Sequence, residues 1–121
     1  MRDIKNVLSK IKQELPNAMA VGVIDVSSGL PIAGIAEQGI DIETTAAYFA
    51  HSLITLSKAT KVVDPNTVLK EMMAVTDSII TLFLFTKSNY AVGVTVRAGV
   101  QLGLVRAVLK NHMPEIEQEL P

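Results

Sequence analysis

The hydrophobic pattern of residues 41–63 is the most distinctive in the chain. It predicts one long helix that Asp41 caps and that ends before Asp64. No residue from 44 to 57 carries a formal charge. A helix on the outside of a small domain needs only one apolar face, but here small and apolar residues form two stripes with helical spacing: Ile42, Ala46, Phe49, Leu53, Leu56, Thr60 and Val63, and beside them Ala47, Ala50, Ile54 and Ser57. We therefore predict that one face contacts its own domain and that the other contacts another protein chain.

Two more segments have the apolar spacing of a helix, one near each end of the chain. The first follows Asp3, a possible N-cap, and ends before Pro16; the second begins near Gly99. Pro114 is expected to kink or restart the second helix, and residues 115–121 are expected to fray. Each segment has a single narrow stripe, so both are predicted to share one side of a sheet. The stripes are Ile4, Val7, Leu8, Ile11 and Leu15, and Leu102, Val105, Leu109, Met113 and Ile116.

The segments between these helices are typical of strands. Pro31 suits an edge strand, because proline cannot donate a backbone hydrogen bond to a neighbouring strand. One later segment is almost wholly apolar, which favours a central position. In the last segment Gly93 lies on a face of small residues, which is expected to let a helix approach closely. The predicted strands are 18–26, 30–36, 68–75, 78–86 and 89–97.

Together these elements predict the order α-β-β-α-β-β-β-α. Short turns favour one five-stranded antiparallel sheet, and apolar residues on both faces of its central strands require helices on both sides. We predict an α+β sandwich, with the long second helix on one face and the two terminal helices on the other. The whole chain, residues 1–121, is expected to form a single domain.

Composition excludes several classes of function. Apolar residues make up 49% and charged residues 19% of the chain, so a folded core is expected. The net charge is −1 and no basic run occurs, which argues against nucleic acid and anionic membranes as main partners. There is no cysteine, no signal-peptide pattern and no apolar run long enough to span a membrane. We predict a cytoplasmic protein without membrane insertion.

Candidate catalytic side chains are few, and each has a simpler explanation. Asp25 and Asp77 lie in predicted turns and Asp41 caps a helix. His51 could form a pH-sensitive contact between subunits, although an exposed histidine without a special role is the favoured interpretation. His51 and His112 lie far apart in sequence. The chain contains no phosphate-binding glycine motif and no recognisable nucleophile pattern. We predict a non-catalytic protein with no cofactor and no metal site.

Two arginines could act on a partner. Arg97 follows a strand and Arg106 lies on the last helix, so either could reach a phosphate site as an arginine finger does. An ion pair on the surface is the favoured interpretation for both.

Several local patterns, taken in order, resemble the roadblock family, the dynein light-chain type of domain. They are Leu15-Pro16-Asn17-Ala18, Gly22-Val23-Ile24-Asp25, Gly29-Leu30-Pro31-Ile32-Ala33, Asp41-Ile42-Glu43 with Ala46-Ala47, Asp77-Ser78 and Tyr90-Ala91-Val92. The resemblance extends over residues 4–109. It implies the fold described above, and a homodimer in which the second helices pack together and the third strands join edge to edge.

The resemblance also implies which residues form the dimer interface. Lys70 and Glu71 would lie near the two-fold axis, unless these charges only protect a free strand edge. The expected interface residues are Ala46, Ala47, Phe49, Ala50, Leu53, Ile54, Ser57, Lys70, Glu71 and Met72.

Members of the roadblock family are scaffolds or regulators rather than enzymes, and most act with Ras-like small GTPases. Some bacterial relatives in gliding motility stimulate such a GTPase. Because this chain has little sequence beyond the core domain, binding to a GTPase, or to another domain of the same fold, is expected more than stimulation of hydrolysis. Two alternatives stay open: a small-ligand sensor domain, and an adaptor light chain of a motor or trafficking complex.

Overall fold

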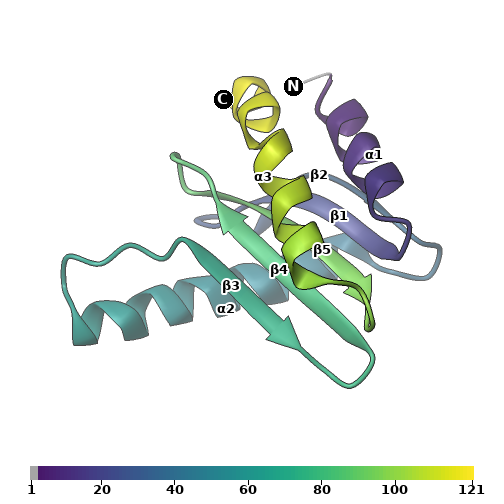
Figure 1. Cartoon of the computed structure of the whole chain (residues 1–121). Coiled ribbons are helices and arrows are strands. Elements are labelled where there is room, and N and C mark those ends of the chain that lie inside the picture. The colour runs from purple at the N-terminus through teal and green to yellow at the C-terminus, as the bar shows by residue number, and fades with distance from the viewer. Residues whose placement is uncertain (1–2) are drawn as a thin grey trace.

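The computed structural model describes residues 3–121, which form three helices and one five-stranded antiparallel sheet (Figure 1). The order α-β-β-α-β-β-β-α and the α+β class are as predicted. Two element starts, those of β3 and of the last helix, differ from the prediction by more than one residue. Gly99 has a φ of 100°, which does not fit a right-handed helix, so the last helix begins at Leu102. The elements are α1 (Ile4–Glu14), β1 (Ala18–Asp25), β2 (Leu30–Ala36), α2 (Ile42–Val63), β3 (Glu71–Val75), β4 (Ile79–Phe85), β5 (Tyr90–Arg97) and α3 (Leu102–Glu119).

The strand order in the sheet is β2-β1-β5-β4-β3, so β2 and β3 are its two edges. The edge position predicted for Pro31 is confirmed. Strand β4 lies inside the sheet, as its apolar sequence predicts. Strand β3 begins at Glu71 rather than at residue 68, because residues 64–70 are needed to bring the chain back from the end of α2.

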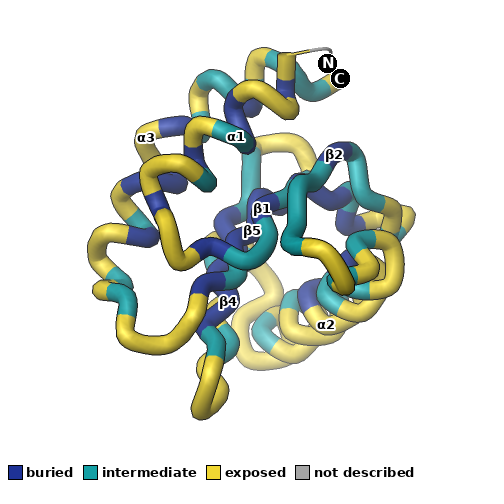
Figure 2. The backbone as a smooth tube through the Cα atoms, turned by 90° about the vertical axis from the view of Figure 1, so that its right-hand side faces the viewer, coloured by how far each residue is buried: buried dark blue, intermediate teal, exposed yellow. Residues whose placement is uncertain are grey.

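Helices α1 and α3 cover one face of the sheet and α2 covers the other, as Figure 2 shows. The α1/α3 side holds the larger core, where Leu8, Ile11, Leu109 and Ile116 are fully buried against the valines of β1 and β5. The sharing of one face by the two terminal helices is therefore confirmed.

The α2 side holds a smaller cluster of small and aromatic residues. Phe83 of β4 lies beside Phe49 of α2, with ring centroids 5.0 Å apart. A Cβ atom on Gly93, which pairs with Phe83 in the sheet, would come within 2.3 Å of the Phe83 ring. The expectation that a helix fills the space over Gly93 is therefore wrong, because the aromatic ring of the neighbouring strand occupies it.

The two terminal helices differ from the prediction in their details. Asp3 is at the N-cap position of α1, but its side chain makes no capping hydrogen bond. Helix α3 continues through Pro114 to Glu119, so the predicted fraying after residue 114 is wrong. The reason is that the final turns are anchored: Ile116 is fully buried, and Glu115 and Glu117 bond to Lys10 and to the Lys87 backbone.

Candidate protein-interaction surface

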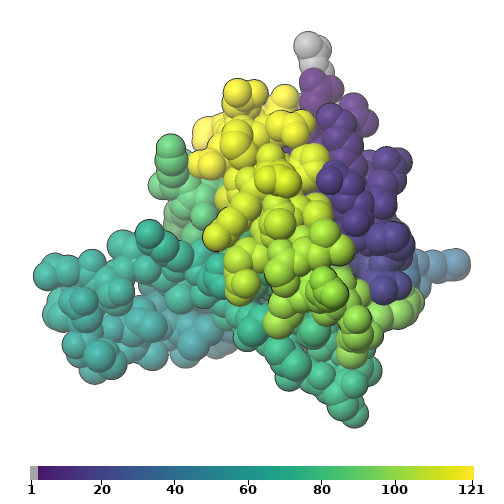
Figure 3. All heavy atoms as spheres, in the orientation of Figure 1, coloured from purple at the N-terminus to yellow at the C-terminus, as the bar shows by residue number. Residues whose placement is uncertain are grey.

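The two halves of α2 have different surroundings. Its buried residues are Ala46, Ala50 and Leu53, and none lies beyond Leu53. The helix has 22 residues and is therefore about 33 Å long, whereas five strands span only about 19 Å from first to last. Figures 1 and 3 show the consequence: the C-terminal end of α2 projects beyond the β3 edge of the sheet. We call residues 54–63 the overhang.

Both ends of α2 are fixed by polar contacts. Asp41 accepts hydrogen bonds from the Thr44 backbone nitrogen (3.2 Å) and from the Thr44 hydroxyl (2.8 Å), which confirms the predicted cap. The hydroxyl bond is the main reason that the pKa of Asp41 is lowered. At the other end the Asp64 backbone donates to the Thr60 carbonyl, and Lys61 donates to the Thr67 carbonyl. These hydrogen bonds hold the C-terminal end of the overhang in an ordered helical conformation.

The overhang and the loop after it expose large apolar side chains. Val62 and Val63 are 85% and 86% exposed, Val68 is 71% exposed and Leu56 is 41% exposed. Isolated apolar residues on a surface are ordinary, but a group of them marks a candidate contact surface.

Strand β3 presents an unpaired backbone edge on the same border of the sheet. The Phe85 nitrogen donates to the Lys70 carbonyl, and the Thr76 nitrogen donates to the Ile79 carbonyl. Backbone groups in an antiparallel pair alternate in direction, so those of Glu71, Met73 and Val75 point away from β4. A free strand edge of this kind can pair with another strand.

The structure places the predicted interface residues in three environments. Ala46, Ala50 and Leu53 are buried against their own sheet, whereas Ala47 and Lys70 are exposed. The others are half-buried: Phe49, Ile54, Ser57 and Met72 on the α2 side of the sheet, and Glu71 on the opposite side, where it pairs with Arg106 of α3. Their part in a dimer therefore stays a prediction.

Both arginines form ion pairs within the chain, as the favoured interpretation predicts. Arg106 of α3 binds both carboxylate oxygens of Glu71, with a closest distance of 2.8 Å, and Arg97 lies 2.7 Å from Glu37. The bond from Arg97 is the main cause of the lowered pKa of Glu37. The first pair ties the edge strand β3 to α3.

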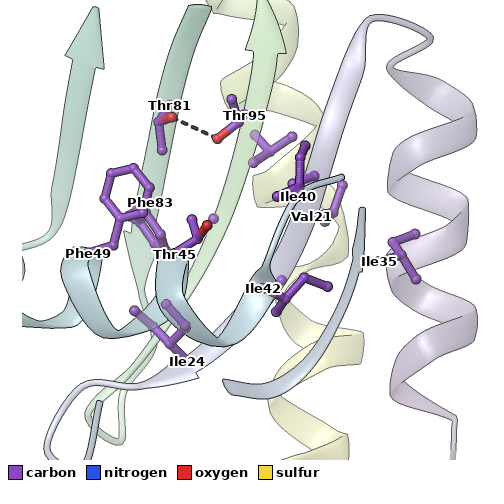
Figure 4. A pocket seen from close by; sticks show the side chains of 15 residues that line it. Val21, Ile24, Ile35, Ile40, Ile42, Thr45, Phe49, Thr81, Phe83 and Thr95 are labelled. Carbon is purple, nitrogen blue, oxygen red and sulfur yellow. Dashed lines mark hydrogen bonds between the residues drawn. The ribbon is translucent and has the colours of Figure 1, made fainter. Parts of the chain in front are cut away.

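A small cavity of about 50 Å³ lies between the first half of α2 and the sheet. Its walls are mostly apolar. Figure 4 shows Thr45 and Phe49 of α2 on one side and the hydroxyls of Thr81 and Thr95, 2.7 Å apart, on the other. A water molecule needs about 10–15 Å³ on this measure, so the cavity has room for a few waters or for one aliphatic side chain.

The aspartates have the structural roles that their positions predict. Asp25 accepts bonds from the Ser27 hydroxyl (2.7 Å) and from its backbone nitrogen (3.0 Å), and the hydroxyl bond is the main cause of its lowered pKa. Asp77 lies in the exposed turn before β4. His51 is exposed on α2.

Sequence reasoning missed His112. This side chain is buried between α1 and α3, with its Nε2 2.5 Å from a Glu14 oxygen and its Nδ1 3.0 Å from a Glu115 oxygen. The signal was available, since position 112 lies on the same helical stripe as Val105 and Ile116. The bond from His112 is also the main cause of the lowered pKa of Glu115.

No helix within residues 3–121 is both long enough and apolar enough to cross a membrane. Comparison of the sequence with protein-family profiles and with curated proteins gives no match. Comparison of the structure does find similar solved folds.

MglB from Myxococcus xanthus is similar with a TM-score of 0.87 and 19% identity, over 98% of this chain and 87% of that one. The gliding protein MglB from Thermus thermophilus has a TM-score of 0.82 and 14% identity, over 97% and 87% of the two chains. A Roadblock/LC7 domain from Streptomyces avermitilis has a TM-score of 0.74 and 13% identity, over 92% and 95%. The chain therefore has the roadblock fold that its sequence resemblance predicts.

Proposed function

We propose that residues 1–121 form a single roadblock-like domain that works as a homodimer, without catalysis of its own. In this proposal it scaffolds or regulates a Ras-like small GTPase, or a second domain of the same fold. The observation that carries the proposal is the border of the sheet where the overhang of α2 and the free edge of β3 lie together.

The free edge favours a second copy of the chain. The outward backbone groups of Glu71, Met73 and Val75 are centred on Met73, so an antiparallel pair of β3 strands can form with Met73 opposite its own copy. Such a pair continues the sheet from one subunit into the next. It also covers the β3 edge in both subunits. An exposed strand edge usually has to be covered or paired, because it can otherwise pair with other chains.

The overhang favours the same partner. In the paired sheet, each overhang extends across the border and over the other subunit. The part of the sheet that it would reach includes Ala74 and Thr81, which are register partners on the α2 side, and Thr95 beside them. Ala74 and Thr95 are only half-buried in the single chain. Each subunit would therefore cover what the other leaves open.

The GTPase part of the proposal rests on the resemblance to the roadblock family and on the shared fold. The absence of catalysis rests on the side chains: Asp25 and Asp41 are occupied by turn and capping bonds, and Arg97 and Arg106 are paired with glutamates. These contacts support a binding role rather than a reaction.

The small-ligand alternative is weaker. This alternative places the ligand between the sheet and a helix, and pockets for metabolites and cofactors have volumes of about 300–1,000 Å³, whereas the cavity under α2 has about 50 Å³. Larger hollows, of about 590 Å³ and 350 Å³, lie along the outer side of α1 and are open to solvent. An adaptor role would use the same dimer and differs only in its partner.

Two measurements test the proposal. Light scattering on the purified chain should give twice the chain mass of 13.0 kDa. Ras-like GTPases, each loaded with GDP or with a non-hydrolysable GTP analogue, should then bind the immobilised dimer with a preference for one nucleotide.

A monomer at micromolar concentration would overturn the homodimer. A dimer that binds no GTPase in either state, but binds another roadblock-fold domain, would support the scaffold and adaptor role instead. Release of phosphate by the chain alone would contradict the non-catalytic assignment.

A further inference from the structure

The sheet has a second free edge, which strand β2 forms on the side opposite β3. The Glu37 nitrogen donates to the Met19 carbonyl of β1 (2.9 Å). Because the backbone groups of an antiparallel pair alternate in direction, those of Ile35 also point to β1, whereas those of Gly34 and Ala36 point outward. Within residues 3–121, no loop or side chain is hydrogen-bonded to these outward groups.

The two halves of this edge differ in how well they are protected against a further strand. In the first half, Pro31 has no N–H and the Leu30 nitrogen donates to the Ser28 hydroxyl (3.3 Å). The pairing with β1 is also irregular beside Pro31, and such irregularities commonly block a strand edge. The second half has neither feature and carries no charge. The open part of the edge is therefore residues 34–36.

A hollow of about 350 Å³ lies beside this open part, on the face of the sheet that α1 covers. Figure 4 shows Ile35 of β2 beside α1, and this side chain packs against the larger core. The hollow is lined by Ile35 and, from α1 and the turn after it, by Ser9, Lys12, Gln13 and Pro16. It therefore combines apolar contact area with three hydrogen-bond donors.

The hollow contains a positive charge without an ion pair. Lys12 is half-buried and makes no salt bridge within residues 3–121. Glu37, at the end of β2, is occupied by Arg97 at 2.7 Å. The bond from Arg97 is the main cause of the lowered pKa of Glu37, and Lys12 adds a smaller effect, so its ammonium group lies near this end of β2. An acidic side chain in the hollow would meet Lys12 together with the donors of Gln13 and Ser9.

We propose that an extended segment of a partner protein binds the second half of β2 as a sixth, antiparallel strand, with a glutamate side chain in the hollow. Gly34 and Ala36 would each exchange two backbone hydrogen bonds with it, and Ile35 would lie between them in a pair without such bonds. Side chains opposite each other share a face, with Cβ atoms about 4.5–5.5 Å apart. The residue opposite Ile35 therefore points into the hollow. A glutamate there places its methylene groups on Ile35 and Pro16 and its carboxylate at Lys12.

A second copy of the chain fits this edge poorly. Pairing two β2 strands about Ile35 would merge two hollows that each contain Lys12 and no acidic side chain. The partner segment therefore belongs to a different protein. Because the inference concerns the edge opposite β3, it does not depend on the proposed homodimer.

Selection from a library of random nine-residue peptides displayed on phage tests the inference. The immobilised full chain is the target, and enriched peptides are synthesised for fluorescence anisotropy. We expect the enriched sequences to share a glutamate with β-branched residues around it. Replacing that glutamate by glutamine should weaken binding about tenfold. On binding, the amide hydrogens of Gly34 and Ala36 should become protected from exchange with solvent.

Two pairs of variants locate the site. Ala36→Pro removes an outward N–H and no bond to β1, so it should weaken peptide binding at least about tenfold. Ala36→Ser keeps the N–H and should bind as the parent chain does. Lys12→Gln should weaken binding of the glutamate peptide about tenfold and spare the glutamine peptide. Lys5→Gln is its matched control, because Lys5 is exposed two turns earlier on the same side of α1, about 10 Å away, and should have no effect.

The absence of any enriched peptide would overturn the proposal, as would equal binding to the parent chain and to a folded Ala36→Pro. If Ala36→Pro does not fold, hydrogen exchange of the parent chain decides: protection of Met73 instead of Gly34 and Ala36 would place the peptide on the β3 edge. Enrichment of lysine or arginine would contradict the charge match. A tetramer of the chain alone that Ala36→Pro converts to a dimer would assign the edge to a second copy. A monomer that still binds the peptides would overturn only the homodimer.

Discussion

The two halves of α2 have similar apolar content and opposite fates. In residues 42–53, Ala46, Ala50 and Leu53 are buried against the sheet. In residues 54–63 none is buried, and Leu56 and Val63 are exposed. The difference arises because the helix is longer than the sheet is wide. An apolar stripe therefore shows that a helix face needs cover, but the geometry of the sheet decides which part its own chain can cover.

This comparison changes the meaning of the two stripes in the sequence. From the sequence, the two stripes are predicted to lie on different faces of the helix, one in contact with its own domain and one in contact with a partner. In the structure both stripes contribute to the buried face: Ala46 and Leu53 come from the first and Ala50 from the second. The division between buried and exposed positions runs mainly along the helix instead, and it falls close to Leu53.

Leu53→Glu should have the largest effect, because it disrupts the packing of residues 42–53 of α2 on the sheet. Leu53 is fully buried, and an uncompensated buried charge costs about 3–5 kcal/mol. That is a large part of the roughly 5–15 kcal/mol that stabilise an ordinary domain. We expect loss of cooperative unfolding in a urea titration followed by circular dichroism. A variant with unchanged stability would mean that this half of α2 does not pack on the sheet.

Leu56→Glu, three residues later, should spare the fold and break the dimer. The side chain is 41% exposed in the single chain, so the charge can stay in water. In the proposed dimer the exposed apolar side of the overhang would be buried against the second copy, and we expect association to weaken on the order of 100-fold. Sedimentation should then show a folded monomer.

The matched control for Leu56→Glu is Val62→Glu. Val62 lies on the same overhang and is 85% exposed, but it projects about 120° around the helix from Leu56. It should keep the mass of the dimer. Equal dissociation by both variants would indicate a general effect of charge on the overhang rather than a specific contact.

Two glycine variants test how tightly the sheet is packed beneath the first half of α2. A Cβ atom on Gly93 would approach the Phe83 ring within 2.3 Å, whereas one on Gly103 of α3 would meet nothing within 4 Å. Gly93→Ala should therefore destabilise the chain by about 1–3 kcal/mol. Gly103→Ala should stabilise it by roughly 0.5–1 kcal/mol, because alanine favours the helix. Thermal unfolding measures both, and equal shifts would show that the Phe83 ring can move aside.

Most of the fold could be predicted from the sequence because its signals are local. The boundaries of α2 follow from the Asp41 cap and from Asp64-Pro65. The edge position of β2 follows from Pro31. The start of β3 could not be predicted, because Val68 has the residue type of a strand and only the course of the chain from the overhang leaves it exposed.

The interaction surface was harder to predict than the fold. A sequence shows that α2 is unusually apolar, but not that the sheet ends near its middle. His112 shows the same limit, since its burial depends on Glu14, which lies on another helix at a sequence separation of 98. Contacts between distant segments decide both cases.

The smallest expected effect concerns the N-terminal cap of α2. The Thr44 hydroxyl lowers the pKa of Asp41, so the fold favours the ionised carboxylate. The contribution of this bond is therefore complete above the ordinary aspartate pKa of about 3.9, and it is lost as the pH falls through the lower pKa of the folded state. Asp41→Asn keeps a capping side chain but removes the charge. It should lower the Tm by a few degrees at pH 7, and the difference from the parent chain should vanish in strong acid.

Thr44→Val is the companion variant, because removing the hydroxyl should return the pKa of Asp41 toward its ordinary value in an NMR titration. A pKa that stays equally low in Thr44→Val would assign the shift to the backbone at the start of α2 rather than to this hydroxyl.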